Sequence, residues 1–347
     1  MTNTKTQIFR GLTFLGAVCG GAILARIGVP LGWLVGAMLV IVAASLTHVP
    51  VFQPKPVMPY VRGAVGAMLG ASIPAGLFGS LSAWWPSLLI MFALMLTGLV
   101  INFLILRRMF SVRPVDAALC AMPGGITEMI VFGESAGGDA RRVAITHALR
   151  IALSILAIPI LAAGLFHVSV SKGTGDVAVS MSAADWFWFG ACMMSGVLAD
   201  RYSRIPAGFV IVPMALSAGL HLGGVSDFGI PPSVSIAVQV LIGINVGSRF
   251  LGFTLRELTQ VALSALTIVS VQLVLAIIAA TTMATTGRWD PLALLLAYAP
   301  GGLAEMSLIA IGMGREVAFV ACHHIMRVLT SLFLAPPALK RLTRMSP

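Results

Sequence analysis

One stretch of sequence that occurs twice constrains the fold of this chain more than any other feature. The first copy, PGGITEMIVFGESAGGDARRVAITHALR, spans residues 123–150, and the second, PGGLAEMSLIAIGMGREVAFVACHHIMR, spans residues 300–327. The copies align without a gap, so position 123 corresponds to position 300, and 10 of the 28 positions are identical. An internal repeat fixes architecture, so we expect the chain to consist of two related halves.

The duplication extends beyond these two stretches. Pro114 and Pro159 have counterparts in Pro291 and Pro336, which follow them at the same offset along the chain. The longest polar stretch lies between the two halves and indicates a linker. The predicted division is a first membrane repeat over residues 1–172, a linker over residues 173–186 and a second membrane repeat over residues 187–347.

The composition identifies the environment of these halves. Hydrophobic residues make up 58% of the chain and charged residues only 10%, against about 25% charged in ordinary soluble domains. Apolar runs long enough to cross about 30 Å of hydrocarbon recur along the chain, so we expect an all-α polytopic membrane protein in contact with the lipid bilayer. The net charge of +10 comes from basic residues scattered between these runs. They indicate loop charges that set topology, and they argue against nucleic-acid binding.

Loop charges also indicate how the halves are oriented. Arg107 in the first half corresponds to Ala284 in the second, whereas Arg249 in the second corresponds to Ser72. Basic loops that change sides between copies are expected of inverted repeats. An inversion needs an odd number of crossings per half, and the Pro-Gly-Gly break indicates the segment that does not cross. The positive-inside rule then favours two inverted five-span repeats, about ten transmembrane helices, with both termini cytoplasmic. The Gly-rich segment 61–81 is an alternative for the broken element.

The Pro-Gly-Gly break predicts a binding site. Non-helical backbone at membrane depth is tolerated only where it is buried in protein or lines a wet cavity. We expect a short helix to begin at Pro123, with Glu128 in its second turn and free N–H groups aimed at the bilayer middle. Two such ends would form a site for a small polar or anionic solute; the alternative is a kinked helix that only packs. The substrate-binding candidates of the two breaks are Pro123, Gly124, Gly125, Pro300, Gly301 and Gly302.

Two glutamates follow the breaks. A carboxylate at membrane depth costs several kcal/mol unless it is paired or protonated, so Glu128 and Glu305 are candidate coupling sites for H⁺ or Na⁺. The alternative for each is a structural partner of Arg150 or Arg327. Those arginines are candidates for binding a substrate carboxylate, because a guanidinium offers it a planar fork.

Histidines accompany the arginines at the same spacing. His147 and His324 each lie three residues before the arginine, on the same helix face, and they are candidates for proton coupling. Asn245 differs from its counterpart Met68 and is a candidate for substrate specificity. His323 has no counterpart in the first copy and points about 100° away from its neighbour on a helix, so we set it aside.

Enzymatic functions have little support. None of the six histidines has the HxH or HExxH spacing of a copper or zinc centre, and the four cysteines show no CxxC spacing. GESAG at residues 133–137 resembles a nucleophile elbow only by its letters, because the strand–turn–helix context is absent. We therefore expect no metal, no cofactor and no catalytic residue.

The doubled PGGxxEM motif, followed each time by a His and an Arg, resembles the AbrB-duplication family of bacterial inner-membrane proteins. The motif stands here at residues 123–129 with His147 and Arg150, and at residues 300–306 with His324 and Arg327. The resemblance implies a multi-pass protein of the bacterial inner membrane. The family is catalogued both as ammonia monooxygenase and as a membrane regulator of gene expression, so it implies no single mechanism.

The leading functional hypothesis is a secondary transporter or exporter of a small polar or anionic solute, coupled to protons or Na⁺. The alternative is a membrane-embedded sensor that regulates gene expression through a cytoplasmic partner. An ammonia monooxygenase-like membrane enzyme is a remote third hypothesis. A homo-oligomer is compatible with all three.

Overall fold

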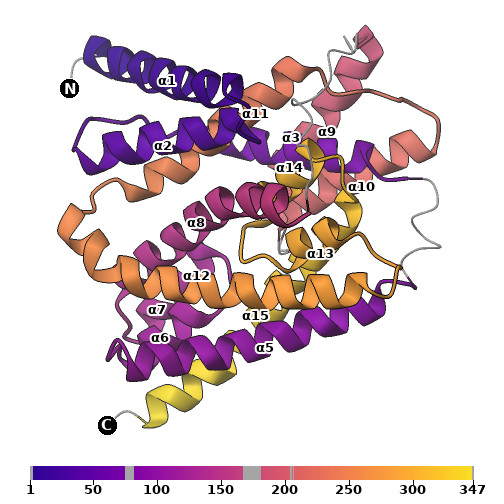
Figure 1. Cartoon of the computed structure of the whole chain (residues 1–347). Helices are drawn as coiled ribbons and strands as arrows, with labels where there is room; N and C mark the ends of the chain where they lie inside the picture. The colour runs from indigo at the N-terminus through magenta and orange to yellow at the C-terminus, as the bar shows by residue number, and fades with distance from the viewer. Residues whose placement is uncertain (1–2, 75–81, 167–180, 204, 206, 346–347) are drawn as a thin grey trace. The chain divides into compact units, whose positions relative to one another are not determined.

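The chain is helical throughout the part that the computed structural model describes, which is residues 3–74, 82–166, 181–203, 205 and 207–345. These residues contain no β-strand, and one 3-10 turn, η1 (Ser248–Phe250), interrupts the series of α-helices (Figure 1). The helices are α1 (Asn3–Arg26), α2 (Gly32–Leu46), α3 (Met58–Ala71), α5 (Trp85–Arg108), α6 (Pro114–Ala121), α7 (Ile126–Ser135), α8 (Ala140–Phe166), α9 (Ala183–Tyr202), α10 (Gly208–Leu222), α11 (Pro232–Gly247), α12 (Leu255–Ala284), α13 (Pro291–Tyr298), α14 (Leu303–Gly312) and α15 (Val317–Met345).

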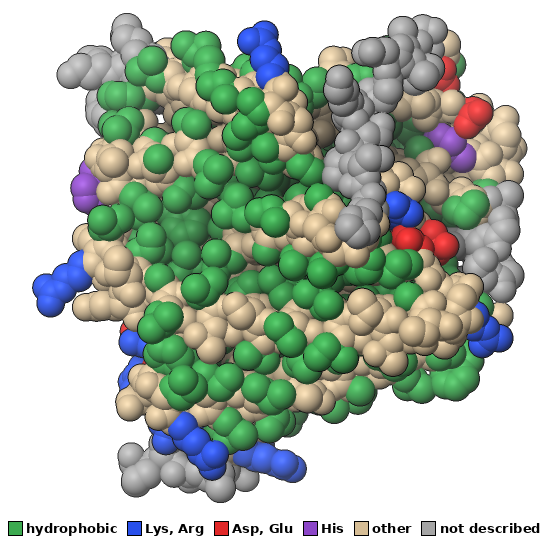
Figure 2. All heavy atoms as spheres, viewed as in Figure 1, with side chains coloured by type: hydrophobic (Ala, Val, Ile, Leu, Met, Phe, Trp, Pro, Cys, Tyr) green, Lys and Arg blue, Asp and Glu red, His purple; other side chains and the backbone are tan. Residues whose placement is uncertain are grey.

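Several of these helices have the length and composition to cross a membrane. Among the described residues, six helices could span a membrane, namely α1, α5, α8, α11, α12 and α15. Their outward side chains are apolar, with Leu89, Ile160 and Phe333 exposed by 57%, 71% and 77%. Figure 2 shows hydrophobic side chains spread over the drawn face, with few charges between them. A soluble protein with so large an exposed apolar surface would tend to aggregate in water. The chain is an all-α polytopic membrane protein, as the composition predicts.

The helix boundaries follow the sequence repeat. α6 and α13 begin and end at corresponding positions of the two copies, and so do α7 and α14, while α8 and α15 begin at corresponding positions. Pro159 and Pro336 occupy matching places inside α8 and α15. The repeated sequence therefore produces the same local structure twice, while the opposite orientation of the copies stays a prediction.

The described chain forms two compact units, and each takes segments from both sequence halves. The units do not coincide with the predicted repeats, because the repeats are defined by similarity in sequence and the units by proximity in space. The predicted linker 173–186 lies mostly outside the described residues, and α9 begins within it at Ala183. Unit 1 comprises residues 1–79, 159–253 and 304–318, and unit 2 comprises residues 80–158, 254–303 and 319–347.

Unit 1 is held together by close helix packing. α2 packs on α1 and α11, and α3 packs on α9 and α10. A Cβ atom built on Gly66 of α3 would lie 2.6 Å from the Val210 carbonyl oxygen of α10, so only glycine permits this approach. The Gly-rich segment is an uninterrupted helix over Met58–Ala71. Over these residues its glycines serve packing, and the break suggested as an alternative is not there.

Unit 2 is built around α5 and α12, which lie side by side (Figure 1). α5 also packs on α6, and α12 packs on α13. A core cluster joins both long helices to the first broken segment and to α15, through buried residues such as Leu106, Leu119, Ile268 and Ala335. Both Pro-Gly-Gly prolines lie in this unit, so unit 2 is where the predicted site can be tested.

Candidate functional site

The first Pro-Gly-Gly stretch is an extended break between two short helices. α6 ends at Ala121 and α7 begins at Ile126, with ψ angles of 132° at Met122 and 147° at Gly125. The predicted helix start at Pro123 is therefore wrong, and Glu128 lies in the first turn of its helix instead of the second. The reason is local, because proline disfavours helical geometry at the residue before it and two glycines extend easily.

The two short helices form a hairpin. The backbone N–H of Asp139, which follows α7, donates to Oδ1 of Asp116 in the first turn of α6, at 2.7 Å. The chain thus returns to the point where the segment began, with the break at its tip. α6 has 8 residues and α7 has 10, so each is only about 12–15 Å long and too short to cross the hydrocarbon core. Such a hairpin is the local geometry that a re-entrant segment needs, while its placement in the membrane stays a prediction.

Two side chains of α8 hold the tip of this hairpin. The Arg150 guanidinium donates from Nη1 to the Met122 carbonyl and from Nη2 to the Gly124 carbonyl, both at 2.9 Å. The His147 Nε2 lies 3.0 Å from the Leu119 carbonyl, so it donates to the end of α6. A broken helix exposes carbonyl groups that lipid cannot satisfy, and these two residues satisfy them.

The second copy repeats these contacts. Arg327 donates from Nη1 to the Ala299 carbonyl and from Nη2 to the Gly301 carbonyl. His324 Nε2 donates to the Leu296 carbonyl at 2.9 Å, and its Nδ1 accepts from Arg327 Nη2. All of these contacts join the same positions as in the first copy, apart from the His–Arg bond. The repeated His and Arg therefore support the backbone breaks; a further role in coupling or substrate binding stays a prediction.

A small cavity of about 40 Å³ brings the two breaks together within unit 2. Pro123 and Pro300 both line it, and so does Arg327, which is 7% exposed. One turn beyond Arg327, the Ser331 hydroxyl lies 3.1 Å from the Pro123 carbonyl, which ties the second motif to the first break. The rest of the wall comes from α5, α12 and α13, with Met91, Leu94, Met95, Gly98, Gln272, Leu275, Ala276 and Tyr298.

The cavity is positively polarised. Arg327 and Arg150 lie close enough for their charges to repel. None of the described residues that line the cavity is acidic, and Gln272 and Tyr298 are its remaining polar side chains. Gln272 Oε1 is buried without a hydrogen-bond partner. A volume of about 40 Å³ exceeds the roughly 10–15 Å³ that one water molecule needs, so the cavity can hold water or a small ion.

The two glutamates do not line this cavity. Glu128 and Glu305 occupy the first turns of α7 and α14, where a carboxylate is stabilised by the partial positive charge of the helix start. The Glu128 carboxylate folds back toward Gly125. In unit 1, Glu305 is 7% exposed and lies 4.0 Å from Nη2 of Arg249. Glu305 thus has Arg249 as a structural partner, and the predicted coupling role of both glutamates is untested.

The remaining sequence candidates lie outside the cavity wall. Gly124 and Gly301 contribute carbonyl groups to the arginines, and Gly125 and Gly302 follow them in the break. Asn245 lies on α11 in unit 1, where its carbonyl accepts from Ser248. Its predicted role in specificity has no contact here to support it.

The sequence argument did not select four polar residues of unit 2, and it set one of them, His323, aside. Gln272 and Tyr298 line the cavity, while Ser87 forms hydrogen bonds with both Tyr298 and His323. Three of them, Gln272, Tyr298 and His323, are asymmetric, because the first copy has Met95, Ala121 and Thr146 at the corresponding positions. A search for residues that recur in both copies discards residues that are polar in one copy only. The signal that could have found them is a polar side chain in one copy at a position where the other copy has an apolar or smaller side chain.

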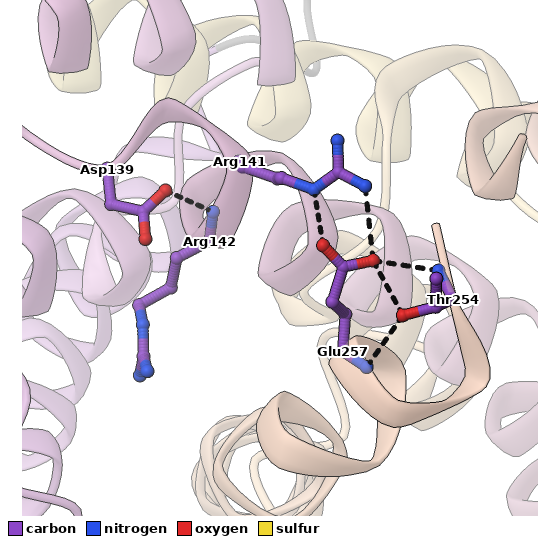
Figure 3. Close-up of polar contacts among 5 residues, drawn as sticks. All are labelled: Asp139, Arg141, Arg142, Thr254 and Glu257. Atoms are coloured by element: carbon purple, nitrogen blue, oxygen red, sulfur yellow. Dashed lines mark hydrogen bonds and ion pairs between the residues drawn. The ribbon is translucent and has the colours of Figure 1, made fainter. Parts of the chain in front are cut away.

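A second polar cluster involves Arg141 at the start of α8 and Glu257 at the start of α12 (Figure 3). Arg141 of α8 donates to both carboxylate oxygens of Glu257, at 2.6 and 3.1 Å. Glu257 also accepts from Thr254, which caps the start of α12. Arg141 has no basic counterpart in the second copy, where Ala318 stands. The pair joins the starts of α8 and α12 in unit 2.

Comparison with known proteins identifies the family. A family model described as "Transition state regulatory protein AbrB" matches residues 33–343. The "Uncharacterized protein YhjN" of Bacillus subtilis (strain 168) is 23% identical over an alignment of 364 positions, gaps included, and the alignment covers 95% of this chain and 92% of that protein. The "Putative regulator AbrB" of Escherichia coli (strain K12) is 24% identical over an alignment of 349 positions, and this alignment covers 94% of this chain and 95% of that protein. With a match across most of its length, the chain belongs to the AbrB family.

Proposed function

We propose that this protein is a secondary transporter of a small anionic solute and not an enzyme. The observation that carries the proposal is the cavity at which the two Pro-Gly-Gly breaks meet, with a buried arginine in its wall. Broken helices at a shared polar cavity are the arrangement by which many transporters bind solutes inside the membrane.

The charge of the cavity favours an anion over a cation or a neutral solute. The described residues of the wall include a buried guanidinium and no acidic side chain, so they leave an uncompensated positive charge. An unpaired charge in a low-dielectric site is costly, so a partner of opposite charge gains most by binding there. The second guanidinium, on Arg150, adds to the same field. The volume of about 40 Å³ suits an anion of a few atoms.

Transport of a panel of small anions tests this proposal. The purified protein in liposomes is exposed to gradients of chloride, nitrate, formate or phosphate, and influx is compared with that in empty liposomes. Gln272→Leu should reduce the flux, because it removes a polar group from the cavity wall without removing an arginine that supports a break. Gln260→Leu, the same substitution at an exposed position of the same helix, is the matched control. Equal flux in empty liposomes and in those with protein contradicts the proposal.

Localisation and topology form part of the proposal. The protein is proposed to lie in the bacterial inner membrane, with about ten crossings and both termini cytoplasmic, in line with the basic loops and the positive-inside rule. The re-entrant hairpin of α6 and α7 supports an odd number of crossings in the first half. Reporter fusions at the two ends test it, and activity of the two reporters on opposite sides of the membrane contradicts it.

A sensor that regulates gene expression is the second candidate. The name of the Escherichia coli relative, "Putative regulator AbrB", favours it. A sensor of this kind needs a cytoplasmic partner protein that binds specifically to the ligand-bound form of the membrane protein. Retrieval of one specific soluble regulator by the full-length protein, together with no anion flux in liposomes, would favour the sensor over the transporter.

A further inference from the structure

A chain of hydrogen bonds leads from the cavity wall into the protein. Tyr298, which lines the cavity, has its hydroxyl 2.7 Å from Ser87 Oγ, and Ser87 Oγ lies 2.9 Å from His323 Nε2. Ser87 and His323 are fully buried, and Tyr298 is 8% exposed. The three residues come from α5, α13 and α15, all within unit 2.

The hydrogen bonds define which atoms hold protons. His323 Nδ1 lies 2.8 Å from the Phe319 carbonyl, which can only accept, so Nδ1 carries a proton. In the neutral imidazole Nε2 is then an acceptor, and it receives the Ser87 hydroxyl proton. Ser87 Oγ can in turn accept from Tyr298. The chain thus runs as a series of donors from the cavity wall toward a histidine that can take one more proton.

This histidine is not committed to supporting a backbone break. His324 donates to a helix end and accepts from Arg327, so both of its ring nitrogens are engaged in the scaffold. His323 has a hydroxyl at Nε2, and a hydroxyl can either donate or accept. Among the described residues, the titratable groups that face His323 are Tyr298 on α13 and the neighbouring His324. The nearby group from α12 is Met283, which does not titrate and whose sulfur lies 2.9 Å from the Tyr298 hydroxyl.

We propose that Tyr298, Ser87 and His323 form the proton site of this protein, and that the coupling ion is H⁺ rather than Na⁺. The inference rests on the proposed function, since the cavity supplies the anion that the proton accompanies. It assigns coupling to residues of the second copy together with Ser87 of α5.

Proton uptake proceeds through this chain in one balanced step. A hydronium ion in the cavity gives a proton to the Tyr298 oxygen, the original Tyr298 proton moves to Ser87 Oγ, and the Ser87 proton moves to His323 Nε2. A water molecule stays in the cavity and the positive charge stays on the imidazolium. The hydrogen bonds of the chain then run in the opposite direction, and the Tyr298 hydroxyl has Met283 Sδ as its acceptor.

Burial links this proton to the anion. A buried imidazolium is penalised unless an opposite charge compensates it. An anion in the cavity supplies the compensation. The protein therefore holds the proton while the anion is bound, and binding of either one favours the other to the same degree.

Proton movement into liposomes tests the coupling. Liposomes containing a pH-sensitive dye receive an inward gradient of chloride, nitrate, formate or phosphate, and dye response and anion influx are measured together. In the wild type an inward pH gradient should raise influx by about fivefold or more. Ser87→Ala and His323→Gln should each reduce this stimulation to about onefold while a basal anion flux persists, and Ser87→Thr should restore part of it. Tyr298→Phe alters the cavity wall, so it is judged on the ratio of influx with and without the pH gradient, which should also fall to about onefold. His48→Gln, at an exposed position, is the control.

A measurement without transport separates this inference from the proposed function. In full-length protein labelled with ¹⁵N-histidine, the His323 signal is assigned by its loss in His323→Gln. It should change protonation state between about pH 4 and about pH 9 in 100 mM of at least one of the four anions, at a midpoint that Ser87→Ala shifts. A His323 signal in one protonation state under all these conditions overturns the inference. Pronounced pH stimulation that survives His323→Gln overturns it as well, and absent flux with a titrating His323 overturns only the proposed function.

Discussion

Removal of the arginine at either break should destabilise the protein, because the backbone carbonyls that it satisfies lose their hydrogen-bond donors. In Arg150→Met the apolar stem keeps its packing, while the carbonyls of Met122 and Gly124 lose their donors. A hydrogen bond to a charged group contributes about 1.5–3 kcal/mol in soluble proteins, and interhelical bonds in a membrane protein average about 0.6 kcal/mol. Two lost bonds therefore correspond to about 1–6 kcal/mol. We expect about 3 kcal/mol, since both carbonyls are left without solvent.

Arg327→Met should have a similar effect, because Arg327 makes the matching pair of bonds at the second break. Lysine at position 150 should recover about half of the loss, since an ammonium reaches one carbonyl and lacks the planar fork. Arg108→Met is the control, because Arg108 is exposed at the end of α5.

Thermal unfolding of the purified protein in detergent, followed by tryptophan fluorescence, measures the effect. A loss of about 3 kcal/mol corresponds to a Tm decrease of about 6 °C or more, at about 2 °C for each kcal/mol in a chain of this size. A Tm for Arg150→Met within about 1 °C of the wild type would refute the reasoning, provided that Arg108→Met also leaves Tm unchanged.

Three further predictions concern other parts of the chain. Gly66→Ala should destabilise unit 1 by about 1–3 kcal/mol, because the new Cβ meets the α10 backbone. The control is Gly219→Ala, where a Cβ meets nothing within 4 Å, so Tm should stay equal or rise. Equal Tm decreases in both variants would contradict the packing argument. Arg141→Ala should lower Tm slightly in low salt and leave it unchanged at high salt, as expected for an exposed pair; a Tm decrease that persists at high salt would count against it. Hydrogen bonds from Ser226 and Ser182 hold the pKa of Asp185 below its ordinary value of 3.8. The ionised form is thereby stabilised, so this contribution is present above pH 3.8 and is lost as pH falls through the lower folded-state pKa. The Tm difference between wild type and Asp185→Asn should therefore shrink in acid, and a difference that is constant with pH would contradict it.

The repeated sequence predicted the broken segments well because their cause is local. Proline and paired glycines interrupt a helix wherever they occur, so the breaks near Pro123 and Pro300 follow from the residues alone. The hairpin of α6 and α7 is the geometry expected of a segment that turns back, while the crossing count from loop charges stays a prediction. The helix start was misplaced, at Pro123 instead of Ile126. The error came from treating the proline as a first helical residue when both glycines continue the extended stretch.

The functional residues were harder to predict, because their partners are distant in sequence. His147 and Arg150 stood out as ionisable residues, but their partners are backbone carbonyls 26 to 28 residues away, which no spacing rule identifies. His323 was set aside for lack of a counterpart, yet its contact with Ser87 joins positions 236 residues apart. Repetition finds residues that support a shared backbone shape. It misses residues that make one copy different from the other.

The interleaving of the two units has a consequence for biosynthesis. The core of unit 1 joins Ala37 and Ile41 of α2 to Val240 and Ile244 of α11, so it cannot close until the ribosome has made most of the chain. The helices that are synthesised first, such as α2, are therefore inserted in the bilayer before the helices on which they finally pack have been made. A chain that stops at the end of its first half thus carries two unfinished cores, and it becomes a substrate for membrane quality control instead of a smaller working protein.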